Sequence, residues 1–166
     1  MPKLLLTIAI TIFVAAGRPA SGQMDLEDEI LSLAGVTDFG LVVDIESTLP
    51  SGAAGLDNSI WRDALSETLR ELTGTSPATR VDPTRDSHLY VHVNAMSVGD
   101  DLVPFAIEAS FVQKARVDKG QDMMVVTWET GLVGLVTQNQ LSQVLQGGIG
   151  VVEEFAGDLK QARLLE

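Results

Sequence analysis

The chain has 166 residues and carries 23 acidic against 11 basic side chains, a formal net charge of −12. Such a surface repels nucleic-acid phosphates and anionic lipid head groups, and no cluster of lysines and arginines offsets it, so nucleic-acid binding is not expected. The chain contains no cysteine, which excludes disulfides and attachment of a lipid to cysteine.

The first 22 residues have the layout of a secretory signal peptide. Lys3 gives a basic start, the apolar run 4–16 is interrupted only by threonines, and small residues follow around Pro19. A helix over that run reaches about 20 Å, short of the ~30 Å hydrocarbon core, so an uncleaved membrane anchor is the less favoured alternative. We expect cleavage before Gln23, with cleavage after Ala16 as the alternative, and a periplasmic or secreted protein without a stable membrane span.

The expected mature chain suits a single domain that can build one core without metals or disulfides. It carries 9 basic and 23 acidic side chains, a net charge of −14, because Lys3 and Arg18 lie in the signal peptide. The sequence thus predicts a signal peptide at 1–22, an N-terminal arm or short helix at 23–39, and a single α+β domain at 40–166.

Residues 24–34 predict a short helix, with a loosely held arm as the alternative. The first turns contain acidic residues, which the helix dipole favours, and Gly35 follows as a stop. These residues are Asp25, Glu27, Asp28 and Glu29. Residues 41–47 alternate between apolar and mixed positions, which predicts a strand with one covered face.

A helix is predicted at 59–73, where apolar residues recur at spacings of three to five. The stripe contains Ile60, Ala64 or Leu65, Leu69 and Leu72. Asp57, Asn58 or Ser59 can cap its start, and Gly74 stands where a C-terminal cap glycine belongs. Trp61 lies beside the stripe and is expected to help cover the sheet.

Three alternating segments follow a possible short strand at 79–82. They cover 88–98, 104–117 and 122–131 and are joined by short turns, so they predict an antiparallel meander. The next stretch, "GLVGLV" at 131–136, predicts a strand continuation in the core. An exposed apolar loop for a protein or lipid partner is the alternative.

The last segment, 140–164, has apolar residues at helical spacing but contains Gly147, Gly148 and Gly150. Each glycine costs a helix ~1 kcal/mol relative to alanine. They predict a kink, with close packing on the sheet or two separate helices as alternatives. The order β-α-β-β-β-β-α predicts an α+β fold in which two main helices pack on one face of an antiparallel sheet of about four to five strands.

Both histidines and the single tyrosine lie in one predicted strand. In a strand, His88, Tyr90, His92 and Asn94 share one face, opposite the core positions. His88 and His92 are then about 13 Å apart, too far to hold one metal ion at ~2.1 Å from each nitrogen. The row predicts a solvated or partner-facing sheet surface, with a ligand surface or a metal site as less favoured alternatives.

No other stretch has a catalytic or cofactor pattern. There is no thiol and no Gly-x-Ser-x-Gly elbow, and the glycine-rich segments lack the lysine of a phosphate loop. The pairs Asp44/Glu46 and Asp100/Asp101 have the pattern of solvated carboxylates. We therefore predict no enzymatic activity, no catalytic residue, no cofactor and no metal.

Four stretches together resemble a layout of short exported bacterial proteins of unassigned function. They are "GLDNSIWRDALSETLREL", "LYVHVNAM", "TWETG" and "VVEEFAGDL". The chain departs from that layout at His92, where asparagine is usual, and at 157–159, which lacks a tyrosine. The α+β order is also similar, as fold analogy only, to the N-terminal domain of TolB.

These features predict an exported, non-enzymatic periplasmic protein that binds another component of the cell envelope. Addition of a partner strand to a sheet edge would supply affinity through backbone hydrogen bonds. The alternative is a small-molecule binding domain or a weak hydrolase that uses the face of His88, Tyr90 and His92.

Overall fold

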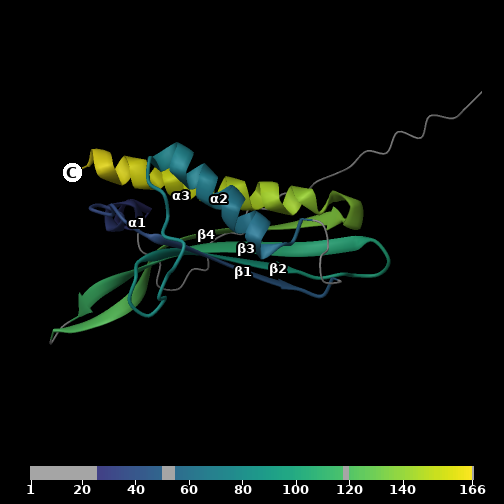
Figure 1. Ribbon diagram of the computed structural model, residues 1–166, viewed down its shortest axis with the longest axis horizontal. Coiled ribbons are helices and arrows are strands. Elements are labelled where there is room, and N and C mark those ends of the chain that lie inside the picture. The colour runs from purple at the N-terminus through teal and green to yellow at the C-terminus, as the bar shows by residue number, and fades with distance from the viewer. Residues whose placement is uncertain (1–25, 50–54, 118–119, 166) are drawn as a thin grey trace, which may run out of the picture.

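The computed structural model describes residues 26–49, 55–117 and 120–165 (Figure 1). The elements, in chain order, are α1 (Leu26–Ser32), β1 (Gly40–Ser47), α2 (Asn58–Thr73), β2 (His88–Ala95), β3 (Leu102–Val117), β4 (Gln121–Thr137), the 3-10 helix η1 (Gln138–Gln140) and α3 (Ser142–Leu164). None of the described helices is both long enough and apolar enough to cross a membrane. The expected signal peptide and its cleavage before Gln23 lie outside the described residues.

The fold is α+β, as predicted, with a single four-stranded sheet in the order β1-β2-β3-β4. The meander β2-β3-β4 is antiparallel, as predicted. The prediction of a wholly antiparallel sheet is wrong, because β1 and β2 pair in parallel. The chain between Ser47 and His88 contains α2 and is long enough to return to the same end of the sheet, which a parallel pair requires.

The possible short strand at 79–82 is not formed. Instead, Ala78 makes an isolated bridge to Gly40, and the chain then turns. The backbone N–H of Thr84 donates to the Asp82 carboxylate, and the backbone N–H of Asp82 donates to the Asp86 carboxylate. These side chains accept hydrogen bonds that the backbone of a neighbouring strand would accept in a sheet. The described residues therefore contain four strands.

Helix α2 has the predicted caps. The Asp57 carboxylate accepts hydrogen bonds from the backbone N–H groups of Ser59 and Ile60, and Gly74 has the left-handed conformation at the C-terminal end. Trp61, Leu65 and Leu69 are fully buried at spacings of four. Ile60, which we expected in the apolar stripe, is 52% exposed because it lies about 100° around the helix from Trp61.

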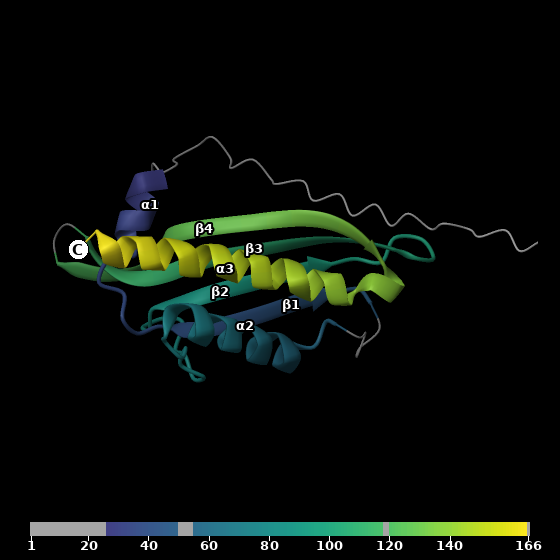
Figure 2. The same cartoon turned by 90° about the horizontal axis from the view of Figure 1, so that it is seen from above.

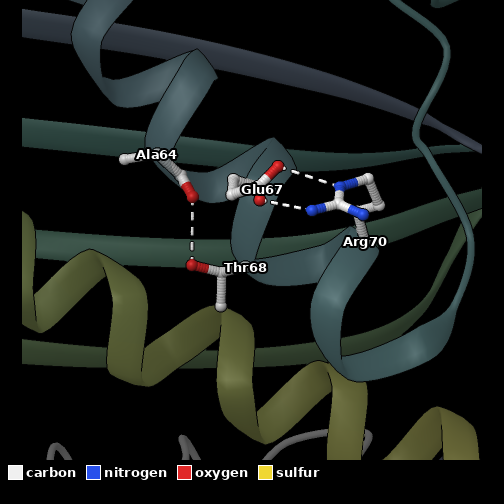
Figure 3. Close-up of polar contacts among 4 residues, drawn as sticks. All are labelled: Ala64, Glu67, Thr68 and Arg70. Atoms are coloured by element: carbon white, nitrogen blue, oxygen red, sulfur yellow. Dashed lines mark hydrogen bonds and ion pairs between the residues drawn. The ribbon is translucent and has the colours of Figure 1, made fainter.

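The solvent side of α2 carries charged residues (Figure 3). Glu67 and Arg70 form a two-point ion pair there, and the Thr68 hydroxyl donates to the Ala64 carbonyl on the same helix. The hydrogen bond from Arg70 is the main cause of the lowered pKa of the Glu67 carboxyl. The two sides of α2 therefore differ as an amphipathic helix requires.

Helix α3 runs without interruption through its three glycines (Figure 2), so the predicted kink is wrong and close packing applies instead. A Cβ at Gly148 would lie 2.3 Å from the Trp61 ring, and one at Gly147 would lie 3.3 Å from Ile107. The two glycines therefore let α3 approach both α2 and the sheet. Gly150 faces open space and makes no such contact.

Helices α2 and α3 cover the same face of the sheet, as predicted (Figure 1). Aromatic rings from three elements and the segment before β1 meet in this core with centroids 5.1–6.0 Å apart. They belong to Phe39, Phe111, Trp128 and Phe155. A bulge at Thr127 shifts the β3–β4 register between Phe111 and Val112, and the Trp128 indole N–H donates to Asp158 on α3.

Helix α1 lies against β4 and α3, in the segment expected as a short helix or arm (Figure 2). Its residue Ile30 and the following Leu33 are buried. The Ser32 hydroxyl donates to the Thr127 carbonyl, and Gln113 donates to the Ser32 carbonyl. Glu27 and Asp28 are exposed, whereas Glu29 is buried.

Candidate functional site

The face of the sheet opposite α2 and α3 is the candidate functional site. No helix covers it within the ranges that the structure describes (Figure 1). Strand register arranges its side chains in cross-strand rows. From one end of the strands to the other, the rows are Val42–Tyr90–Ser110–Glu129, Asp44–His92–Glu108–Gly131, Glu46–Asn94–Ala106–Val133 and Met96–Pro104–Leu135.

Asp44, Tyr90 and His92 form a polar contact group on this face. The Tyr90 hydroxyl donates to an Asp44 carboxylate oxygen at 3.0 Å. His92 Nδ1 lies 3.7 Å from the same oxygen and 3.5 Å from the Tyr90 hydroxyl. The two rings are nearly parallel, with an interplanar angle of 17°. The parallel pairing of β1 with β2 brings Asp44 to this position, which the period-two pattern of 41–47 does not indicate by itself.

The Tyr90 phenol has a raised pKa. Partial burial is the largest cause, followed by the hydrogen bond to Asp44. The negative charges of Asp44, Glu46 and Glu108 raise this pKa further, because they oppose formation of a phenolate. Three carboxylates from β1 and β3 therefore lie close enough to act on one residue of β2.

His88 does not belong to the exposed set of side chains that we predicted along β2. It is 4% exposed, and its Nδ1 lies 2.8 Å from the Asp86 carbonyl. On the neighbouring strand, the outward position of Gly40, its register partner, is occupied by the Val81 side chain from the loop between α2 and β2. Tyr90, His92 and Asn94 remain partly exposed, so the predicted row of four is shortened to three.

Large apolar side chains gather at the other end of the same face. Val133 and Leu135 are 40% and 44% exposed, because the "GLVGLV" stretch continues β4 as a strand and turns its alternate residues outward. Leu132 is partly buried and Val136 is buried. The predicted strand continuation is therefore confirmed. The predicted core position holds only for Leu132 and Val136. The exposed apolar residues of this end, here called the apolar patch, are Met96, Val98, Leu102, Val133 and Leu135.

A shallow groove of about 440 Å³ lies between the polar group and the apolar patch. Its side-chain lining comes from three strands: β2 and its continuation, β3 and β4. The main residues are His92, Asn94, Met96, Pro104, Ala106, Glu108 and Val133. Extending the alternation of 88–94 to Met96 and Val98 could have indicated these apolar neighbours, but their grouping with Leu135 depends on the β3–β4 register.

The described strands hold basic residues only near the β3–β4 hairpin. There, Lys114 Nζ lies 2.8 Å from Asp122, and Arg116 Nε lies 3.3 Å from it. Hydrogen bonds from these two residues lower the pKa of the Asp122 carboxyl. Neither cation is on the four rows of the candidate site, so the side chains of those rows are aromatic, polar, apolar or acidic.

The site's reactive chemistry is limited. Among the residues placed by the structure, no group of three or more histidines, aspartates and glutamates is arranged to hold a metal ion. Within the same residues, no serine or threonine hydroxyl forms a hydrogen bond with His92. What the arrangement can do is bind: it combines an apolar surface with hydrogen-bond acceptors.

No protein-family model matches the sequence, and no curated protein is significantly similar to it. A function for this chain therefore has to be inferred from its own residues.

Proposed function

We propose that the protein is exported and binds another protein of the cell envelope through the helix-free face of its sheet, without catalysing a reaction. The observation that carries this proposal is the apolar patch, whose five large side chains are 40–51% exposed on one contiguous end of a face. A protein interface needs such an apolar centre within a polar border, and Glu46, Glu108 and Asn94 supply the border here.

The outer edge of β4 can add to the same interface. Its backbone would pair with an incoming strand, which assigns to β4 the strand addition that the sequence analysis expected at an unnamed sheet edge. The Thr127 bulge and the bond from Ser32 to the Thr127 carbonyl occupy one part of this edge. An added strand would therefore pair beyond the bulge, along 131–137, next to the outward side chains of Val133 and Leu135.

Export is supported by the basic, apolar and small-residue order of 1–22 and by the resemblance to short exported bacterial proteins. A periplasmic or extracellular location also fits an acidic domain that has no cysteine. Fractionation by osmotic shock and N-terminal sequencing would test it. We expect release with the periplasmic fraction and a start at Gln23, whereas a cytoplasmic protein that retains Met1 would contradict export.

A second candidate is a small-molecule binding domain or weak hydrolase, because Asp44, Tyr90 and His92 contact one another beside the groove. Its test is a thermal-shift screen of small ligands against the wild type and His92→Gln. A ligand at a hundredfold excess over Kd stabilises the fold by ~2.7 kcal/mol, so a shift that His92→Gln removes would favour this candidate.

The protein-binding proposal is tested by affinity capture from periplasmic extract with three proteins. They are the wild type, the sheet-face variant Val133→Asp/Leu135→Asp, and the helix-face control Ile60→Asp/Leu164→Asp, whose sites are 52% and 85% exposed. We expect one partner to be captured by the wild type and the control but not by the sheet-face variant. Equal capture by all three, or capture of nothing but the protein itself, would contradict the proposal.

A further inference from the structure

Ala106 is a small residue in the lining of the groove, and Gly131 is a small residue in the neighbouring cross-strand row. Ala106 lies between Asn94 and Val133 in one cross-strand row, and Gly131 lies beside Glu108 in the next. A Cβ at Gly131 would be 2.9 Å from the Ile107 carbonyl oxygen, which belongs to the backbone and cannot rotate away. A larger residue at Gly131 would therefore disturb the pairing of β3 with β4 beside the groove.

The groove extends along the strands across three rows. Its lining runs from Met96 and Pro104, through Asn94, Ala106 and Val133, to His92 and Glu108. Successive rows are about 6.6 Å apart, which is two strand residues, so the groove is roughly 13 Å long. Alternate side chains of an extended peptide repeat at the same distance, so such a peptide can place one side chain in each row.

The polar end of the groove is acidic. Glu46 and Glu108 are exposed, and neither side-chain carboxylate forms an ion pair or hydrogen bond within the part of the chain that the structure describes. Asp44 adds a third carboxylate, 3.7 Å from His92. Two copies of this face in contact would oppose like charges, which disfavours a homodimer, whereas lysine or arginine side chains would complement it.

We infer that the groove binds an extended segment of the partner protein in which an apolar side chain is flanked, two or four residues away, by lysine or arginine. The inference rests on the proposed function and names the chemistry of the partner. The apolar side chain lies over Ala106 between Met96 and Val133, and the basic side chain lies beside Glu108 and Glu46. An acidic segment, or a second copy of this chain, does not fit the same face.

The test begins with random peptides displayed on phage and selected on the purified protein. Peptides that also bind the Val133→Asp variant are removed. We expect the selected peptides to be enriched in lysine and arginine at positions two or four residues from an apolar residue. Selection of acidic peptides, an absence of basic enrichment, or no selected peptide at all would overturn the inference.

The carboxylates are then tested with the selected peptide of highest affinity. We expect Glu46→Gln/Glu108→Gln to weaken binding about fivefold to tenfold, and to reduce its dependence on salt, as loss of two exposed ion pairs predicts. The matched control Asp63→Asn/Glu153→Gln changes the net charge equally, but on exposed positions of α2 and α3. Equal weakening by the control would mean that overall charge, not the groove, attracts the peptide.

Two further results separate this inference from the proposed function. If Val133→Asp/Leu135→Asp prevents capture of the envelope partner but the selected peptides show no basic enrichment, only the inference fails. If that variant captures the partner as well as the wild type does, the proposed function fails. Sedimentation velocity that shows a wild-type dimer, absent in Val133→Asp, would replace the partner segment with a second copy.

Discussion

Tyr90 reports the acidic surroundings of the candidate site, because it is the chain's single tyrosine. Its raised pKa means that the folded state favours the neutral phenol. We expect an alkaline titration, followed by tyrosinate absorbance, to give a midpoint above ~10, the ordinary value for tyrosine. Asp44→Asn should lower the midpoint, since it removes a charge and the best acceptor of the hydroxyl, while Asp63→Asn on α2 should leave it unchanged.

The same shift fixes the sign of a pH effect on stability. A group whose folded pKa is raised contributes stability below its unfolded pKa, here ~10, and this contribution is lost as the pH rises through the folded pKa. The free energy of unfolding by urea should therefore fall as the pH rises above ~10 in the wild type. The fall should be smaller in Tyr90→Phe, which has no phenol to titrate. A folded-state midpoint at or below 10 would contradict the described arrangement of Asp44, Tyr90 and Glu108.

His88 and His92 should differ in their response to the same substitution. His88→Gln removes a buried ring and its contact with the Asp86 carbonyl, so we expect a loss of about 1–2 kcal/mol in the free energy of unfolding. His92→Gln changes a partly exposed residue and should stay within about 0.5 kcal/mol. Urea unfolding of both variants checks this, and equal effects would mean that His88 is exposed as the alternation alone had suggested.

Helix α3 offers a contrast between two glycines of one element. Gly148→Ala places a methyl group within 2.3 Å of the Trp61 ring and should cost about 1–3 kcal/mol by overpacking. Gly150→Ala meets no atom within 4 Å and should stabilise the protein by about 0.5–1 kcal/mol. The two melting temperatures should therefore move in opposite directions. A rise for both would mean that α3 does not pack closely on α2.

Sequence periodicity was sufficient for most elements but not for their contacts. The caps Asp57 and Gly74 located α2, because capping chemistry is local. The outcome at the two glycines was not local, since Gly148 packs on Trp61, more than eighty residues earlier, and Gly147 packs on Ile107 of β3. The helical pattern indicates how much helix stability a glycine costs. Whether close packing compensates that cost depends on the residue that packs against the glycine in the fold.

The strand pairing explains the remaining errors. The direction of β1 relative to β2 could have been inferred from the long connection that contains α2, but the period-two pattern of 41–47 is the same in parallel and antiparallel pairs. That direction brings Asp44 to His92. The burial of His88 depends on the loop that contains Val81, which local periodicity had indicated only as a possible short strand at 79–82 and could not place beside Gly40.

For the whole molecule, the distribution of charge and apolar surface matters more than any single residue. Both main helices lie on one face, and their core residues are buried there. The other face retains an apolar patch next to carboxylates. The sequence analysis had identified Tyr90, His92 and Asn94 as part of an interaction surface, but it had not joined them to Leu102, Val133 or Leu135, because these residues meet only when β2, β3 and β4 pair.

The proposed role of the helix-free face is tested most directly by photo-crosslinking in living cells. A photoreactive amino acid would replace Val133 in one variant and Asp63, on the exposed side of α2, in another. We expect Val133 to crosslink to one partner protein, and Asp63 to give no such product. Crosslinking of the same partner from Asp63 but not from Val133 would place the interface on the helices and contradict the account.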